Sequence, residues 1–413
     1  MKSGWLRCVL VACWLLFLVN CGGSSKSTLV YIASQGSNPG TISAYSLNLS
    51  KGTLSSSNGA LTPTGKSVPT GTQPGPLIFD PTNSFAYVAD FGNPLAAGTD
   101  NSKKSGDIAA FSVGKDGTLS SLGLTATLLD CVTLHPVALA MDSKAHFLFV
   151  ANQAFSNVNS GANCPGAPAD GTPAAGVVTV FAVSSGKLGT PSTTAIPVPA
   201  GPPGTTTPTP TAIAASNQGN FVYITDSTNA TVVGFAFDSN GALSSVPGQF
   251  FLVGNTPRAV LSPPAGNFLY VANAGTDDIY EFVINTDGSL MPISATTTTV
   301  GTGVGPIAML TDPGAKYLYA LANGGSQITG YTVNHVTGAL TDVTANGGTV
   351  STGANPVAFT IRSDGSTSGN FWVLTSNFGG NSVSTFSLNG ATGTLSALPQ
   401  LTGAVAPYGI AAR

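Results

Sequence analysis

The chain has 413 residues, of which 8% are charged, and its formal net charge is −3. The 51 glycines and 28 prolines argue against long helices, because proline removes a backbone donor and glycine gives up chain entropy on folding. Regularly spaced Val, Ile, Phe and Tyr supply a core and argue against disorder, and the lack of a basic excess argues against nucleic acid as a partner.

The first 20 residues have the pattern of an export signal. A positively charged start precedes residues 8–19, an apolar stretch too short to span a bilayer as a mature helix. The next segment, LVNCGGSSKS, resembles the lipobox of bacterial lipoproteins, in which Cys21 would carry the lipid. We therefore expect a lipoprotein signal peptide over 1–20, a lipid-anchored linker over 21–27 and a place in a bacterial cell envelope. An ordinary signal peptide followed by an unmodified cysteine is the alternative.

A repeat runs through the rest of the sequence. The segment NTPRAVLSPPAGNFLYVANAG, residues 255–275, has near-copies in PIAMLTDPGAKYLYALANGG and PGPLIFDPTNSFAYVADFG. Each copy has a proline before a short apolar run, then a YVAN-type strand, an Ile/Val-x-x-aromatic strand and a Gly-x-Leu turn. The opening prolines are Pro76, Pro136, Pro210, Pro257, Pro306, Pro356 and Pro407. The glycines of the Gly-x-Leu turns are Gly52, Gly117, Gly186, Gly241, Gly288, Gly338 and Gly393.

Each copy supplies four short strands, so the sequence predicts an all-β fold. From Pro210 onward the period is about 50 residues, which is typical of propeller blades rather than helical solenoids. The repeats begin at a second strand and end on a first strand. We therefore expect a seven-bladed β-propeller of four-stranded blades over 28–413, with residues 407–412 as the innermost strand of the first blade, closing the ring.

The YVAN strands and proline openings resemble the YVTN-type and lactonase-like seven-bladed propellers, a group that includes 6-phosphogluconolactonase-type proteins. The similarity covers residues 28–413. It implies lactone ring opening by a His-Pro-His segment, an Arg-His pair and a Glu that follows a YVxN strand. These groups fit the reaction, because lactone hydrolysis needs a general base and a cationic group near the oxyanion.

Most of that catalytic set is missing from this chain. Residues 75–77, Gly-Pro-Leu, stand at the His-Pro-His position. Arg258 is kept in TPRAVL but is followed by alanine, and LYVANAG has alanine in place of the Glu. The third blade keeps His135 in LHPVAL without the second histidine. Arg258 and His135 are therefore the candidate catalytic residues.

Other chemistry is sparse. The three histidines, His135, His146 and His335, are far apart in sequence and lack metal-ligand spacing, so we interpret each as a loop residue. No phosphate-binding loop, nucleophile elbow or Cys-x-x-Cys is present. We therefore expect neither a metal nor a cofactor.

Polar residues recur where the second strands end. We expect them to cap the strand by bonding their own turn backbone. A ring of polar groups facing a shared ligand is the alternative. The residues are Ser34, Asp90, Asn152, Asp226, Asn273, Asn323 and Asn377.

Three long connections break the symmetry of the repeat: residues 91–107, 153–176 and 190–210. All three lie on the face where second strands join third strands and one blade joins the next, here called the insertion face. Cys131 and Cys164 fall on the same face, and we expect a disulfide between them in an exported protein. Surface loops that only drift in length are the alternative to a binding site there.

Three classes of function fit these observations. The first is an exported, lipid-anchored module that binds a protein, a glycan or a small molecule through the insertion face and meets the membrane only through its lipid. The second is a lactone hydrolase with a depleted catalytic set, in which Arg258 and His135 would act. The third is a structural protein of the envelope. The missing catalytic groups favour the binding module.

Overall fold

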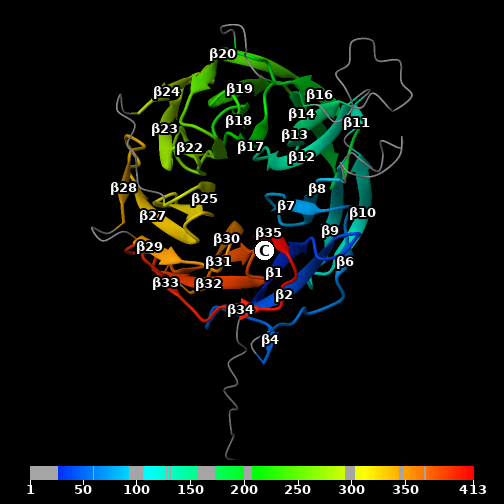
Figure 1. The fold of residues 1–413 in the computed structure, drawn as a ribbon, viewed down its shortest axis with the longest axis vertical. Helices are drawn as coiled ribbons and strands as arrows, with labels where there is room; N and C mark the ends of the chain where they lie inside the picture. Colours follow the sequence, from blue (N-terminus) through cyan, green and yellow to red (C-terminus); the bar gives the residue numbers. More distant parts are fainter. Residues whose placement is uncertain are drawn as a thin grey trace, which may run out of the picture.

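The structure is a computed structural model in which every regular element of the described residues is a β-strand. The strands form seven sheets, arranged radially around a centre (Figure 1). The expected all-β, seven-bladed propeller is therefore confirmed. No helix in the described part of the chain has the length and apolar character needed to cross a membrane. The described residues are 27–58, 60–92, 106–126, 128–129, 132–156, 173–199, 207–293, 303–343, 348–366 and 369–413.

The first three blades differ in how many short strands they add to the four-stranded order. From the centre outward, the first blade contains β35 (Pro407–Ala412), β1 (Ser27–Ser34), β2 (Thr41–Asn48) and β3 (Thr53–Leu54), with β6 (Val68–Pro69) also on β2. The second blade contains β7 (Pro74–Phe79), β8 (Phe85–Asp90), β9 (Asp107–Val113) and β10 (Leu119–Ala126). The third contains β12 (Val132–Met141), β13 (Phe147–Ser156), β14 (Pro173–Ser184) and β15 (Lys187–Leu188), with β11 (Leu128–Leu129) on β12 and β16 (Ser192–Ala195) on β14.

The remaining four blades follow the same antiparallel order. The fourth contains β17 (Pro210–Ala215), β18 (Phe221–Asp226), β19 (Thr231–Phe237) and β20 (Leu243–Leu252). The fifth contains β21 (Pro257–Leu261), β22 (Phe268–Asn273), β23 (Asp278–Ile284) and β24 (Leu290–Pro292). The sixth contains β25 (Pro306–Thr311), β26 (Tyr317–Ala322), β27 (Gln327–Val333), β28 (Leu340–Asp342) and β29 (Gly348–Ser351). The seventh contains β30 (Pro356–Ser363), β31 (Phe371–Asn377), β32 (Ser382–Leu388), β33 (Leu395–Ala397) and β34 (Leu401–Thr402).

The two ends of the propeller meet in one sheet, as predicted. β35 pairs antiparallel with β1, and Ile410 lies opposite Ile32. The backbone N–H of Arg413 donates to the Leu29 carbonyl at 3.0 Å, beyond the last residue of β35. A short hairpin of the first blade, β4 (Ser56–Ser57) and β5 (Ala60–Leu61), also pairs in parallel with β34 of the last blade. The two ends of the propeller are therefore joined within the first blade, and the β4–β5 hairpin also joins this blade to the outer edge of the last one.

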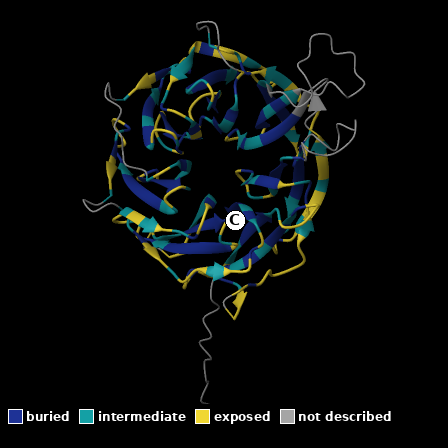
Figure 2. Ribbon diagram, in the orientation of Figure 1, coloured by how far each residue is buried: buried dark blue, intermediate teal, exposed yellow. Residues whose placement is uncertain are grey.

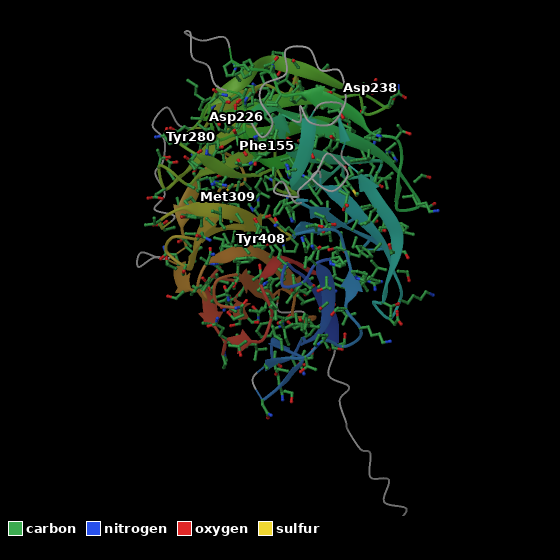
Figure 3. All side chains as sticks on the ribbon, turned by 45° about the vertical axis from the view of Figure 1, so that its right-hand side comes forward. Phe155, Asp226, Asp238, Tyr280, Met309 and Tyr408 are labelled. Atoms are coloured by element: carbon green, nitrogen blue, oxygen red, sulfur yellow. The ribbon has the colours of Figure 1, made fainter. Side chains whose placement is uncertain are left out.

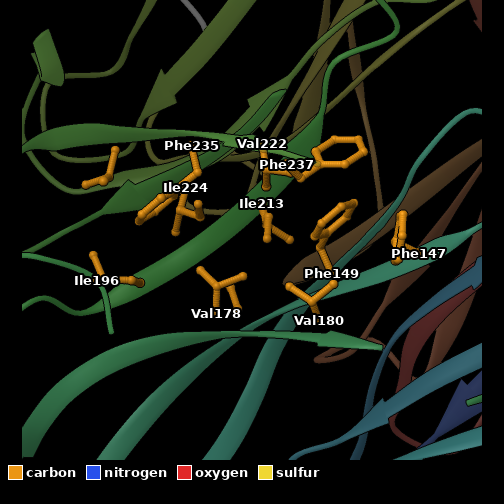
Figure 4. Close-up of a cluster of buried hydrophobic side chains, with 12 residues drawn as sticks. Phe147, Phe149, Val178, Val180, Ile196, Ile213, Val222, Ile224, Phe235 and Phe237 are labelled. Atoms are coloured by element: carbon orange, nitrogen blue, oxygen red, sulfur yellow. The ribbon is translucent and has the colours of Figure 1, made fainter. Parts of the chain in front are cut away.

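The core lies between blades rather than inside them. Seven clusters of buried apolar side chains each combine two neighbouring blades, one cluster for every interface of the ring. Figure 4 shows the cluster between the third and fourth blades, where Phe149 and Val178 face Ile213 and Phe235. Burial is concentrated in the middle strands, and exposed residues lie along the outer rim (Figure 2). Face-to-face packing of adjacent sheets therefore stabilises the ring.

The glycine of each Gly-x-Leu turn is required by this packing. All seven have positive φ, from 67° at Gly52 to 83° at Gly117 and Gly288. A Cβ at any of them would meet a large side chain of the preceding blade, for example Phe221 at Gly288. In five interfaces a buried tyrosine of the preceding blade also donates its hydroxyl to the carbonyl of that glycine, at 2.7 Å from Tyr270 to Gly338. The turn is therefore a docking point between blades.

Two of the expected long loops are partly strand. β13 and β14 continue the third blade to Ser156 and from Pro173, so the described ends of that insertion form a hairpin extension. Ser192–Ala195, expected in the loop that leads to the fourth blade, is the outer strand β16. Extension of an existing ladder satisfies backbone groups that a loop would leave to solvent. The expectation that these whole segments are loops was therefore wrong.

Candidate functional site

Each inner strand carries a β-bulge directly after its opening proline. In the fifth blade Pro257 lies opposite Asn273 and Ala259 lies opposite Ala272, which leaves Arg258 as the extra residue. A bulge bends the strand and redirects the side chain of the extra residue. The equivalent positions in six blades are Val137, Thr211, Arg258, Ile307, Val357 and Tyr408.

These six residues all line one cavity on the axis of the ring, with a volume of about 730 Å³. Because first strands begin and second strands end at the insertion face, the cavity opens on that face. Arg258 is exposed, and it is the only charged side chain among the described residues that line the cavity. The walls are otherwise mainly apolar, a composition typical of small-molecule sites.

In the second blade the opening proline is not the one expected from the sequence. Pro74, not Pro76, lies opposite Asp90, the place that an opening proline holds in the other blades. Gln73 before it has φ of 56°, close to the 51° of Thr256 before Pro257. The expected match of residues 75–77 to His-Pro-His was therefore shifted by two positions, because two prolines lie close together there. The corrected segment, Gln-Pro-Gly, also lacks histidine.

Tyr408 is a site residue that the sequence reasoning missed. It projects from β35 near the axis (Figure 3), and its ring meets Phe91 and Phe378 edge-on at 5.4 and 6.1 Å. Burial raises the pKa of Tyr408, while the positive charge of Arg258 acts in the opposite direction. The phenol is therefore a hydrogen-bond donor at neutral pH. Its position after the opening proline, matching Arg258, is the sequence signal that could have identified it.

Two other polar side chains of the cavity, Thr211 and Asn323, already have partners. Thr211 donates to the Pro257 carbonyl at 2.6 Å, and the amide of Asn323 donates to the Pro356 carbonyl at 2.8 Å. These bonds connect neighbouring blades around the cavity. Arg258 and Tyr408 are thus the side chains best able to bind a ligand through polar contacts.

His135 does not lie in a loop and does not line the cavity. It belongs to β12, is 5% exposed, and donates from Nδ1 to the Phe91 carbonyl at 2.6 Å. Burial lowers the pKa of His135, so the ring is neutral at physiological pH, and its Nε2 is buried without a hydrogen-bond partner in the described residues. The ring packs edge-on against Phe155 at 5.2 Å. In this position His135 is held apart from Arg258 and acts in packing.

Of the polar residues at second-strand ends, Ser34 and Asn323 are partly exposed and the other five are buried. Only some of the seven cap their own turn. Asp226 accepts backbone N–H groups from Thr209 and Thr228, at 2.9 and 3.1 Å. Asn273 instead donates to the Asp278 carboxylate across the ladder, at 2.7 Å. In the sixth blade Ala322 holds the equivalent position, so the choice of Asn323 was shifted by one residue.

At the end of its second strand, the second blade pairs Asp90 with Asp107, whereas the fifth blade pairs Asn273 with Asp278 at the same position. Asp107 lies directly opposite Asp90, which is fully buried. Burial and the Asp107 charge raise the pKa of Asp90 to about 8. Asp90 is therefore protonated at neutral pH and takes the place of the donor that Asn273 supplies in the fifth blade.

The structure does not describe the cysteines of the sequence analysis. Cys21, Cys131 and Cys164 are outside the described residues, so the lipid and the disulfide stay predictions. Within the described residues no group of three His, Cys, Asp or Glu side chains is arranged to hold a metal ion.

A closed ring of seven sheets around one axial cavity defines a β-propeller. The family model "Lactonase, 7-bladed beta-propeller" matches residues 28–163 and 174–305, and the chain belongs to this family.

Solved structures show the same fold. The periplasmic gluconolactonase PpgL of Pseudomonas aeruginosa superposes with a TM-score of 0.73 at 18% identity, over 94% of this chain and 99% of that one. A putative 6-phosphogluconolactonase of Bacteroides fragilis gives a TM-score of 0.69 at 19% identity, over 94% and 98%. A putative 6-phosphogluconolactonase of Bacteroides uniformis gives a TM-score of 0.69 at 20% identity, over 94% of this chain and 99% of that one. No curated protein matches the sequence significantly.

Proposed function

We propose that this chain hydrolyses lactones of the sugar-acid type in its axial cavity. The proposal rests on the family match together with one observation: Arg258, the single cation among the described residues of the cavity, shares it with the phenol of Tyr408. It replaces the insertion-face binding module as the first choice, because membership of the lactonase family favours the hydrolase.

The proposed roles follow from the chemistry of these two groups. Attack of water on a lactone carbonyl places negative charge on its oxygen, and donors aimed at that oxygen stabilise the transition state. The Arg258 guanidinium would donate to it, with the neutral Tyr408 hydroxyl as a second donor. The apolar wall would hold the ring and limit access of bulk water.

The lining also favours a second candidate, binding of a sugar acid or lactone without turnover. No carboxylate or imidazole is among the described residues of the cavity, so a general base for the attacking water is missing there. A carboxylate product would still pair with Arg258. Two further alternatives remain: binding of a protein or glycan at the insertion face, and a structural role in the envelope. The signal peptide over 1–20 and the lipid on Cys21 remain proposals.

The test is hydrolysis of a lactone panel by the purified chain without residues 1–21. We expect turnover above the uncatalysed rate that falls by about 100-fold in Arg258→Ala, the size seen when one oxyanion donor is removed. Tyr408→Phe should lose less, and Lys51→Ala, which removes an exposed cation, should match the parent.

The outcomes separate the two candidates. No turnover, with melting temperature raised by aldonic acids in the parent but not in Arg258→Ala, would favour the binding protein. No turnover and no ligand effect would remove the axial cavity from consideration.

A further inference from the structure

A second cleft lies on the face opposite the axial cavity, at the seam where the last, first and second blades meet. Its volume is about 510 Å³. The β7–β8 and β9–β10 turns, the start of β1 and the ends of β30 and β35 form its walls. We call it the seam cleft. The residues that matter for its chemistry are Ser27, Thr28, Lys115, Asp116, Arg362 and Arg413.

The seam cleft contains several positively charged side chains, although the chain as a whole has few. Three of the 14 Lys and Arg residues, Lys115, Arg362 and Arg413, line this one cleft. Asp116 is the acidic side chain of the cleft, and the backbone oxygen of Arg413 accepts the Thr28 hydroxyl at 2.6 Å. None of the three cations forms an ion pair within the described part of the chain.

Arg362 is the least satisfied of these cations. It comes from β30 and is half-buried, and its Nε is buried without a hydrogen-bond partner in the described residues. Burial and the nearby Arg413 charge both lower the pKa of Arg362. Two guanidinium groups therefore repel each other here, and the exposed Asp116 carboxylate, which interacts with Arg413, is the one acidic side chain among the lining residues. The repulsion costs free energy that a bound anion would recover.

Arg413 is held in place by bonds that leave most of its donors unused. Its backbone N–H donates to the Leu29 carbonyl at 3.0 Å, and its Nη1 donates to the Gly114 carbonyl at 2.5 Å. A guanidinium has five N–H donors in a planar fork that suits phosphate and carboxylate oxygens. Its position is thus fixed while its capacity to bind an anion remains.

We propose that the seam cleft binds a phosphate-class anion between Arg362, Arg413 and Lys115. Two forks and one ammonium match the several oxygens of a phosphate better than the two of a single carboxylate. This site is separate from the axial cavity and does not depend on the proposed hydrolysis.

The source of the phosphate is either a soluble phosphate compound or the headgroup of an anionic lipid. Ser27, the first described residue of the chain, begins β1 and lines the seam cleft. If Cys21 carries a lipid, the six residues from there to Ser27 reach at most about 20 Å. The seam cleft would then face the membrane, and the axial cavity would face away from it.

The test uses the chain without residues 1–21, so that no lipid anchor contributes to binding. One arm titrates inorganic phosphate by calorimetry, and the other measures sedimentation with phosphatidylcholine vesicles with and without phosphatidylglycerol. The variants are Arg362→Gln and the exposed Lys115→Gln. Lys144→Gln is the control, because it removes an exposed cation from the β12–β13 turn on the same face of the ring.

We expect binding that weakens with added salt and falls by about tenfold or more in Arg362→Gln, less in Lys115→Gln and not at all in Lys144→Gln. Binding of phosphate without vesicles identifies a soluble ligand, and binding of phosphatidylglycerol vesicles that phosphate competes for identifies a headgroup. Absence of both, or equal loss in Arg362→Gln and Lys144→Gln, would overturn the proposal. Lys115→Gln keeps the test valid if Arg362→Gln fails to fold.

Discussion

The indole ring of Trp372 in the last blade lies against Gly52 in the first, at the only seam where the two ends of the propeller meet. The indole N–H also donates to the Leu49 carbonyl at 2.9 Å. Every other interface between blades also has a large side chain against the equivalent glycine. The interface between the last and first blades is therefore packed like the others, although its two sides lie far apart in sequence.

Gly52→Ala should destabilise the propeller by about 2–4 kcal/mol, because the φ of 67° is unfavourable for alanine and the new Cβ would collide with the indole. Thermal or urea unfolding followed by circular dichroism would measure the loss. Gly65→Ala is the matched control: a Cβ there meets nothing within 4 Å, and its stability should stay near that of the parent. Equal behaviour of the two variants would contradict this packing role.

The closing strand gives a second prediction. Ile410 is 5% exposed in the cluster between the last and first blades, so Ile410→Ala should cost about 2–5 kcal/mol. Deleting residues 407–413 should abolish the cooperative transition, because β1 would lose its inner partner. Val405→Ala, at a side chain that is 61% exposed, should change the unfolding free energy by less than about 0.5 kcal/mol. A deletion mutant that melts like the parent would refute ring closure by β35.

The Asp90–Asp107 pair predicts a pH dependence. The pKa of Asp90 is raised from 3.8 to about 8 in the folded state, so the folded protein binds this proton more tightly than the unfolded chain does. This contribution to stability is complete below about pH 4, declines as pH rises and is lost above about pH 8.

Asp90→Asn should therefore flatten the decline in stability over that range and exceed the parent above pH 8 by about 1–3 kcal/mol, because an amide can donate to Asp107 as Asn273 does to Asp278. Denaturant midpoints at several pH values would test this. The exposed Asp342→Asn serves as the control. A pH profile of Asp90→Asn that matches the parent would show that the pair does not titrate as described.

Arg258 should matter for ligands and not for folding. The side chain is exposed and forms no hydrogen bond or ion pair within the described residues, so Arg258→Ala should change the unfolding free energy by less than about 0.5 kcal/mol. Differential scanning calorimetry would detect a larger effect. A marked drop in melting temperature would make Arg258 a structural residue, and the proposed oxyanion role would need separate support.

Part of the candidate site could be predicted from sequence. The family resemblance pointed to Arg258, and the repeat placed it at a strand opening on the insertion face. Tyr408 was missed although its strand was predicted, because only the bulge after Pro407 shows that this side chain lines the cavity. The placement of His135 near a candidate site assumed a loop, whereas the extension of β12 and β13 buries it.

The sequence by itself determined the number of blades, their strand order and the closing strand, because the recurring proline, YVAN and Gly-x-Leu landmarks reflect local turn chemistry and alternation in each copy. Only the tertiary structure decided which side chains meet. Bulges after the opening prolines turn Arg258 and Tyr408 into one cavity, and ring closure brings Arg362 beside Arg413. A local repeat fixes what each blade looks like, but contacts between residues far apart in the chain depend on the twist, bulges and closure of the whole ring.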